Sequence, residues 1–226
     1  MKILMVLTSH SELGNSGKKT GFWIEEFAAP YYVFLDAGVS ITIASPKGGQ
    51  PKIDPSSDTP ENQSPAVIRF KADTSLQKIL SETQLLSTVY SDDYDTIFYP
   101  GGYGPLWDLT NDADSINLIE DFWNRKKPIA AVCHVPAVLL NVKDDAGNHL
   151  VKRKNITGFT NSAEAAVELT EVVPFLLENE LKNKGGIYSK KDDWASYVVK
   201  DGMLITGQNP ASSEAAANEL LKLLKV

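Results

Sequence analysis

The chain has 226 residues, of which 42% are hydrophobic and 23% charged, a composition typical of a folded globular protein. Its formal net charge of -7 argues against nucleic acid or an anionic membrane surface as a partner. The single cysteine excludes an internal disulfide, and the sequence shows no stretch of the signal-peptide type and no run of about 18 apolar residues. We therefore expect one domain over residues 1–226, located in the cytoplasm and not in a membrane.

The first part of the chain predicts a β-α-β unit. Lys2 to Leu7 is a continuous apolar run typical of a buried parallel strand. Thr20 to Gly38 carries apolar side chains at helical spacing, and Ser40 to Ala44 predicts a second strand. Pro46 to Pro65 is rich in Pro, Gly, Asp and Ser, and we expect an irregular loop that covers or borders a site. This order indicates a doubly wound sheet.

The remaining patterns continue the alternation of strands and helices. The expected helices are Leu76–Val89, Ser115–Trp123, Ser162–Leu169 with Ser162 as its cap, Pro174–Leu181 and Ser212–Leu224. The expected strands are Tyr94–Tyr99, Ile129–Val132, Ile156–Thr160 and a final hairpin of Val198–Lys200 with Met203–Thr206.

Cys133 lies where a strand, a sharp turn and an apolar helical run meet. Such a junction holds a side chain at the carboxyl edge of the sheet, where α/β proteins bind ligands. The free N–H groups of a following helix predict a thiol more acidic than usual, and His134, the next residue, is a candidate general acid and base. A lone cysteine is more often a small apolar core residue. Its position beside a histidine favours a nucleophile.

Three other residues are candidates from their positions. The Gly102 N–H follows a strand and can donate to an oxyanion together with the His134 amide, although an ordinary tight turn explains the glycine equally well. Glu25 and Glu26 lie in an apolar helix, so that one of them can point inward and transfer protons beside the thiol. Glu164 follows a strand end and can orient His134.

Nucleotide and metal sites are not indicated. The stretch from Gly14 to Thr20 lacks the spacing of a phosphate-binding loop, and Gly102-Tyr103-Gly104 lacks the third glycine of a dinucleotide fingerprint. The three histidines have no metal-ligand spacing around the cysteine. We expect neither a metal nor a cofactor.

Several segments, in this order, resemble the PfpI/ThiJ superfamily, and specifically its glyoxalase III-like, heat-inducible chaperone branch. They are KILMVLTS, KTGFWIEEFAAPYYVFLDAG, YPGGYGPLWDL, AAVCHVPAVLL, ITGFTNSAE and GMLITGQNPASS. The resemblance covers nearly the whole chain. It implies a flavodoxin-like, doubly wound, mostly parallel sheet flanked by helices, with a nucleophile elbow, of the class I glutamine amidotransferase-like type. It also implies a homodimer.

The resemblance also implies roles for particular residues. It places the catalytic cysteine at Cys133, its histidine at His134 and the acid of the triad at Glu164. The acidic residue that contacts the sulfur aligns with Glu26, not Glu25. Tyr103 stands where related loops of the GGHG type have a histidine, which leaves the substrate preference and any role of this side chain open.

The activity implied is conversion of methylglyoxal and related 2-oxoaldehydes to 2-hydroxy acids, without glutathione or another cofactor. Glutamine amidotransfer is disfavoured, because those domains use a late His-x-Glu pair, whereas His149 is followed by Leu150 and Val151. Two alternatives remain open. One is a stress holdase that binds unfolded client proteins and has a redox-sensitive cysteine. The other is a cysteine peptidase or hydrolase, which would need an open cleft that the loop from Pro46 to Pro65 is expected to narrow.

Overall fold

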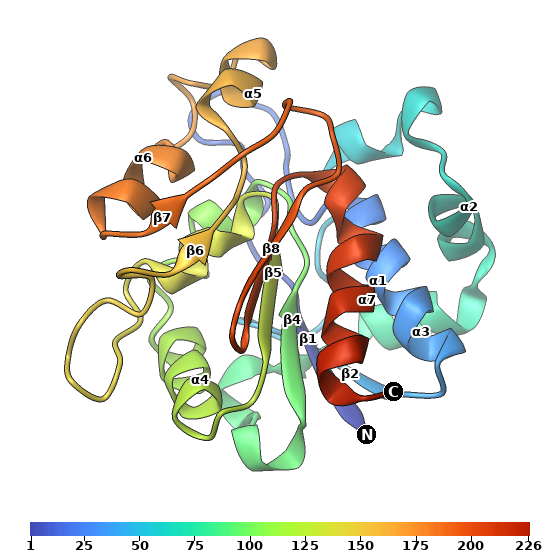
Figure 1. Cartoon of the computed structure of the whole chain (residues 1–226). Coiled ribbons are helices and arrows are strands. Elements are labelled where there is room, and N and C mark those ends of the chain that lie inside the picture. Colours follow the sequence, from blue (N-terminus) through green and yellow to red (C-terminus); the bar gives the residue numbers. More distant parts are fainter.

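A seven-stranded sheet runs through the centre of the computed structural model, which describes residues 1–226 (Figure 1). Its strand order is β3-β2-β1-β4-β5-β9-β8, and every pairing is parallel except that of β8 with β9. The strands are β1 (Lys2–Val6), β2 (Ser40–Ser45), β3 (Gln84–Leu85), β4 (Thr96–Tyr99), β5 (Ile129–Val132), β8 (Val198–Asp201) and β9 (Leu204–Gly207). The continuous apolar runs of β4 and β5 are fully buried, as expected for strands covered on both faces.

Helices cover both faces of this sheet and divide the core in two. On one face lie α1 (Ile24–Asp36), α2 (Pro65–Ala72), α3 (Thr74–Ser81) and α7 (Ser213–Leu224), and on the other α4 (Ala113–Asn124), α5 (Asn161–Ala166) and α6 (Leu177–Asn183). Successive β5 residues alternate between the two cores: Ala130 and Val132 face α1 and α7, while Ile129 and Ala131 face α4. The predicted flavodoxin-like, doubly wound sheet is confirmed.

Short elements complete the chain. A second, two-stranded parallel sheet pairs β6 (Asn155–Ile156) with β7 (Ile187–Tyr188). The strand expected at Ile156–Thr160 is therefore only two residues long, and its partner was not predicted. The short 3₁₀ helices are Pro55–Asp58, Pro60–Asn62, Leu86–Thr88, Ser91–Asp93, Gly104–Leu106, Val135–Leu139 and Pro210–Ser212.

The region between β2 and β4 differs from the sequence prediction. The helix expected at Leu76–Val89 ends at Ser81, and the chain continues into the edge strand β3. The preceding helix, α2, was not predicted. It begins where the Ser64 hydroxyl accepts a hydrogen bond from the Val67 amide (3.2 Å) and Pro65 occupies the first turn, a favourable start for a helix.

The loop before α2 borders the segment that precedes α1. The Phe22 N–H donates to the Lys52 carbonyl and the Asp54 N–H to the Phe22 carbonyl, both at 2.9 Å. The Thr20 hydroxyl donates to the buried Asp54 carboxylate at 2.7 Å. The segment from Pro46 to Pro65 is irregular, as predicted, apart from two 3₁₀ turns. It packs against the residues that precede α1.

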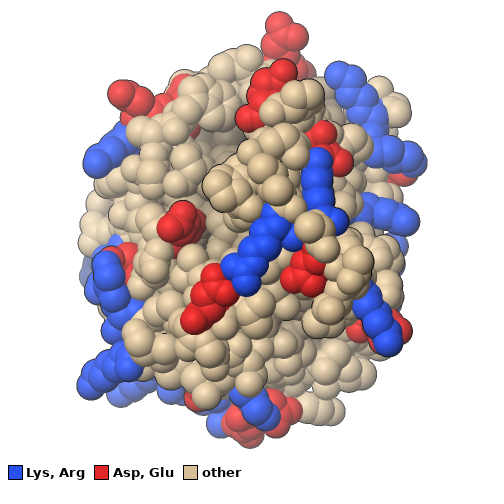
Figure 2. Space-filling model, turned by 90° about the vertical axis from the view of Figure 1, so that its right-hand side faces the viewer, with Lys and Arg blue, Asp and Glu red and all other residues tan.

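Two surface properties complete the description. No helix combines the length and apolarity that crossing a membrane requires. On the face shown in Figure 2, Lys and Arg are interspersed with Asp and Glu, and neither sign forms a continuous patch.

Candidate active site

Cys133 occupies a sharp turn at the carboxyl end of β5. Its φ angle is +62°, in the left-handed region that non-glycine residues rarely adopt. Backbone hydrogen bonds hold the turn on both sides: the Cys133 N–H donates to the Gly207 carbonyl (2.9 Å), and the Phe159 N–H donates to the Cys133 carbonyl (2.8 Å). The predicted elbow is therefore present, and the cysteine is only 4% exposed.

The segment after the elbow is a 3₁₀ helix (Val135–Leu139), not the α-helix expected from the sequence. In an α-helix the Cys133 carbonyl would accept from the Ala137 N–H. Here the Phe159 N–H occupies that carbonyl, and the Ala137 N–H bonds the His134 carbonyl instead (3.1 Å). A residue distant in sequence thus determines the local helix type.

His134 lies between the sulfur and a carboxylate. Its Nδ1 is 3.3 Å from the Cys133 Sγ, and its Nε2 is 2.7 Å from Oε2 of Glu164. Both His134 and Glu164 are almost completely buried. When Nε2 donates its hydrogen to Glu164, neutral imidazole leaves Nδ1 as an acceptor facing the thiol. The geometry allows His134 to take the thiol proton.

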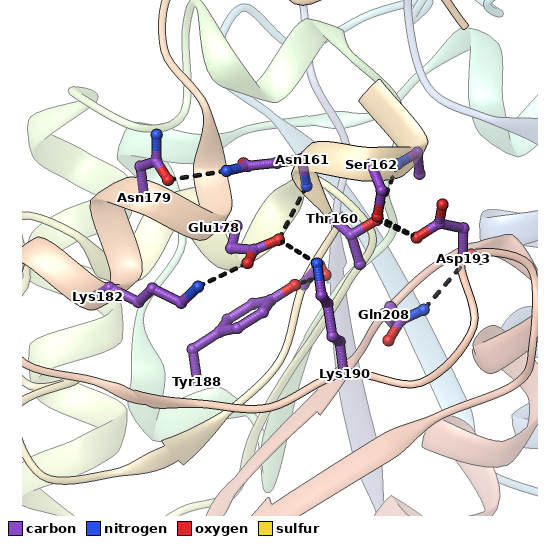
Figure 3. A network of polar contacts seen from close by, with 12 residues as sticks. Thr160, Asn161, Ser162, Glu178, Asn179, Lys182, Tyr188, Lys190, Asp193 and Gln208 are labelled. Atoms are coloured by element: carbon purple, nitrogen blue, oxygen red, sulfur yellow. Dashed lines mark hydrogen bonds and ion pairs between the residues drawn. The ribbon is translucent and has the colours of Figure 1, made fainter. Parts of the chain in front are cut away.

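A polar network fixes the start of α5, the helix that carries Glu164 (Figure 3). The Thr160 hydroxyl accepts from the Ala163 N–H (3.0 Å), so Thr160 caps the helix, and the prediction of Ser162 as the cap was wrong. Thr160 and Ser162 both donate to the Asp193 carboxylate at 2.6 Å. On the other side the buried Glu178 accepts from the Asn161 N–H (2.9 Å) and pairs with Lys182 and Lys190.

Glu26 approaches the sulfur from α1. Its side chain is fully buried, and neither carboxyl oxygen has a hydrogen-bond partner of good geometry. A Cβ at Gly101 would lie 1.8 Å from Glu26 Oε2 and 2.8 Å from Cys133 Cβ, so only glycine leaves room for the carboxyl beside the cysteine. Glu25 points elsewhere and accepts a hydrogen bond from Ser64.

The carboxyl of Glu26 and the thiol of Cys133 form a coupled pair that retains protons. Burial raises the pKa of Glu26 to about 8, although proximity to the Cys133 thiol and the Gly102 amide lowers it somewhat. Burial also raises the pKa of the Cys133 thiol well above its usual value, and the negative charge of Glu26 adds to the effect. The expectation of an unusually acidic thiol is therefore wrong: desolvation outweighs the neighbouring His134 amide, which lowers the pKa.

Gly102 and Tyr103 follow β4 in the adjacent loop. Gly102 has φ +115°, and a Cβ there would lie 2.4 Å from the Gly21 carbonyl oxygen, which explains the glycine. Tyr103 packs its ring against His134 with centroids 4.2 Å apart. Burial, followed by the negative charge of Glu164, raises the pKa of the Tyr103 phenol, so it remains a neutral hydrogen-bond donor.

Aromatic side chains that were not predicted as site residues also surround His134. The Phe159 ring lies 4.2 Å from the imidazole centroid, and Trp194 meets Phe159 edge-on at 6.1 Å. Gly101, which clears space for Glu26, was also missed. The Gly-Gly pair after β4 was the available signal for Gly101, whereas nothing in the local sequence around Trp194 indicates a site.

The predicted residues thus converge on one sulfur, with Glu26 on one side and His134 and Glu164 on the other. No three His, Cys, Asp or Glu side chains are grouped so that they could hold a metal ion.

Comparison with known proteins finds a family match and relatives that cover nearly the whole chain. Residues 19–223 match the DJ-1/PfpI family. Glyoxalase 3 of Candida albicans is 30% identical over 98% of this chain and 97% of its own length. The structure of Rapid Encystment Protein 24 KDa of Francisella tularensis superimposes with a TM-score of 0.94 and 40% identity, covering 99% and 98% of the two chains. Glyoxalase III from C. albicans superimposes with a TM-score of 0.91 and 29% identity, covering 98% and 96%.

Proposed function

The chain belongs to the DJ-1/PfpI family, and on that premise we propose that it is a glutathione-independent glyoxalase that converts methylglyoxal and related 2-oxoaldehydes to 2-hydroxy acids. The observation that carries the proposal is the buried cysteine at a strained elbow, flanked by a protonated carboxyl and by a histidine paired to a second carboxylate. The similarity to C. albicans glyoxalase 3 over nearly both full lengths supports the same activity.

In the first step, the Cys133 sulfur adds to the aldehyde carbon. Because the thiol retains its proton, we assign His134 Nδ1, 3.3 Å from Sγ, as the base that accepts this proton during attack. Glu26 begins protonated and donates to the aldehyde oxygen. The Gly102 and His134 amides stabilise negative charge on that oxygen as it develops. The product of this step is a hemithioacetal.

In the second step, the hydrogen on the former aldehyde carbon moves to the neighbouring carbon. The Glu26 carboxylate, now deprotonated, accepts that hydrogen as a proton, and the His134 imidazolium donates its proton to the ketone oxygen, which gives an enediol. Glu26 then donates its proton to the adjacent carbon while His134 accepts the hydroxyl proton of the sulfur-bearing carbon, which gives a 2-hydroxyacyl thioester on Cys133. Water then hydrolyses the thioester and releases the 2-hydroxy acid and the free thiol. The net reaction adds one water and needs no oxidant or reductant.

The closed surroundings of the sulfur favour a small substrate over a polypeptide. Cys133, Phe159 and Tyr103 are 4%, 5% and 7% exposed. A peptidase would need a cleft that admits an extended chain, and these three side chains leave little surface for one. A small-molecule aldehyde fits this restriction better than an extended peptide.

The proposal is tested by incubating the purified protein with methylglyoxal, without glutathione or added metal, and assaying lactate. We expect lactate from the wild-type protein and an activity at least a thousandfold lower in Cys133→Ser. Thermal unfolding of the variant serves as the control for folding. Lactate formation at the wild-type rate by the serine variant would refute the assignment of Cys133.

The remaining partner and location assignments stay predictions. We propose a cytoplasmic homodimer, which size-exclusion chromatography with light scattering and cell fractionation would test. Binding of unfolded clients is a separate proposal. If the protein is also a holdase, Cys133→Ser should suppress aggregation of a heated test protein as well as the wild type does.

A further inference from the structure

Trp194 is a large aromatic residue that is 56% exposed beside an otherwise closed site. Its ring meets Phe159 edge-on at 6.1 Å, and the Phe159 ring lies 4.2 Å from that of His134. The Phe159 backbone N–H also donates a hydrogen bond to the Cys133 carbonyl. Trp194 is therefore the outward end of a row of rings that begins at the proposed base.

The segment that carries Trp194 is tied down on both sides of the ring. Before it, the Asp193 carboxylate accepts from the Thr160 and Ser162 hydroxyls at 2.6 Å. Around it, the buried amide of Asn209 donates to the carbonyls of Asp193 (2.8 Å) and Ala195 (2.7 Å). Gln208, also fully buried, donates to the carbonyls of Asp192 at 3.1 Å and Asp193 at 3.4 Å, and Figure 3 shows Gln208 beside Asp193. These bonds fix the backbone on both sides of an exposed apolar ring.

Open space adjoins the ring. Trp194 lines a depression of about 690 Å³ together with Ser162, Asp193, Lys190 and Lys191. A substituent that extends outward from a substrate held at Cys133 would meet the indole on one side and room on the other. An aromatic ring on a fixed backbone has few rotatable bonds, so it loses little conformational entropy when a ligand stacks on it.

We propose that Trp194 is a specificity-determining residue that binds the substituent of the 2-oxoaldehyde, so that aryl and other bulky apolar substituents are held more tightly than methyl. This inference rests on the glyoxalase activity proposed above. A phenyl substituent extends farther from the reacting carbons than methyl does, and only an extended substituent can contact a ring that lies beyond Phe159 as seen from His134.

The test compares methylglyoxal with phenylglyoxal in the wild type and in Trp194→Ala. We expect KM for phenylglyoxal to rise about tenfold in the variant, with kcat within twofold, because one aromatic contact accounts for about that factor in affinity. KM for methylglyoxal should change less than about twofold. Trp194→Phe should restore most of the phenylglyoxal affinity. Tyr90→Ala removes another exposed aromatic side chain, 68% exposed and outside the described site, and serves as the matched control.

A binding measurement separates this inference from the proposed function. Mandelate, the unreactive 2-hydroxy acid derived from phenylglyoxal, should bind the wild type about tenfold more tightly than Trp194→Ala in a calorimetric titration. Equal mandelate affinity, or equal loss of methylglyoxal and phenylglyoxal turnover in the variant, would overturn the role of Trp194. An absence of all aldehyde turnover in the wild type would refute the glyoxalase proposal, while the mandelate titration would still decide whether Trp194 binds aryl groups.

Discussion

Two buried carboxylates flank the Cys133 sulfur, and their surroundings differ. Glu164 accepts a hydrogen bond from the His134 Nε2–H at 2.7 Å, and its helix is capped and fixed by the Thr160–Asp193 network. Glu26 is equally buried, yet neither of its oxygens has a hydrogen-bond partner of good geometry, and of hydrogen-bond donors only the Cys133 thiol and the Gly102 amide lie near it. Burial raises the pKa of Glu26 to about 8. Glu164 has one oxygen compensated by a short hydrogen bond, whereas Glu26 has no contact of comparable geometry.

The surroundings of Glu164 stabilise its charged carboxylate, whereas those of Glu26 favour the protonated carboxyl. A buried carboxyl without partners destabilises the folded state at neutral pH, and such groups are found where a proton has to be transferred. A buried carboxylate paired to a histidine holds that ring in one tautomer and orientation. We therefore interpret Glu26 as the group that exchanges protons with substrate and Glu164 as the residue that positions His134.

The largest expected effect follows from replacing Glu26 with glutamine. Glutamine has nearly the same size, but it cannot donate and then accept a proton. We expect kcat for methylglyoxal to fall about a thousandfold with KM little changed, because proton transfer is needed in both steps. Glu171→Gln, which alters an exposed carboxylate, is the matched control and should keep wild-type kinetics. Retention of more than a tenth of the activity by Glu26→Gln would remove Glu26 from the mechanism.

Glu26→Gln should raise the stability of the folded protein near neutral pH, although it lowers kcat. The folded protein holds the Glu26 proton up to about pH 8, whereas the unfolded chain releases it near the ordinary value of 4.5. The contribution of the Glu26 carboxyl to the stability of the folded state is fully present below pH 4.5 and is lost as the pH rises towards 8. Between about pH 5 and pH 7.5 the wild type should lose about 3 kcal/mol from this group.

Urea unfolding at the two pH values measures this loss. Glu26→Gln should lack this part of the pH dependence and should be more stable than the wild type at about pH 7.5. Equal pH dependence in the two proteins would mean that Glu26 ionises normally, and the contrast between the two carboxylates would disappear.

The Glu164→Gln variant should behave differently from Glu26→Gln. The amide oxygen can still accept from His134 Nε2, but the negative charge that fixes the tautomer and stabilises an imidazolium is gone. We expect kcat to fall about a hundredfold and stability to fall by about 1 to 2 kcal/mol, because a buried charge-assisted hydrogen bond becomes a neutral one. Kinetics and urea unfolding measure both quantities. A gain in stability at neutral pH would contradict the supporting role of Glu164.

The sequence predicted the parts of the fold that depend on continuous apolar runs. The strands β1, β4 and β5 lie where the pattern placed them, because burial on both faces requires uninterrupted apolar residues. The closing helix α7 was predicted from the helical spacing of its apolar residues instead. The helix after Cys133 was misjudged because its first carbonyl is bonded by Phe159, which is distant in sequence. The β6–β7 pair was missed for a different reason: two residues per strand leave no periodic signal.

The candidate site was predictable as a set of residues but not as an electrostatic environment. The strand end before Cys133 and the adjacent His134 identified the centre, and the resemblance selected Glu26 over Glu25. The direction of the Cys133 pKa could not be predicted, because it depends on how completely α1, the Gly101 turn and the aromatic rings remove water from the thiol. Trp194 lies in a polar segment whose position is set by the amides of Gln208 and Asn209.

The smallest expected effect concerns Tyr103, which lies on the Glu164 side of the site. Its ring packs on His134. The Glu164 carboxylate is close enough to raise the pKa of the Tyr103 phenol, and its oxygen Oε1 has no hydrogen-bond partner of good geometry. Tyr103→Phe keeps the ring and removes only the hydroxyl, so we expect kcat for methylglyoxal to fall less than tenfold. Tyr103→Ala also removes the packing and should lower kcat further, because His134 gains freedom to rotate. If instead Tyr103→Phe alone lost more than a hundredfold in steady-state kcat, the hydroxyl would have to act on the substrate itself, and the Glu164 side of the sulfur would take part in the chemistry as directly as Glu26.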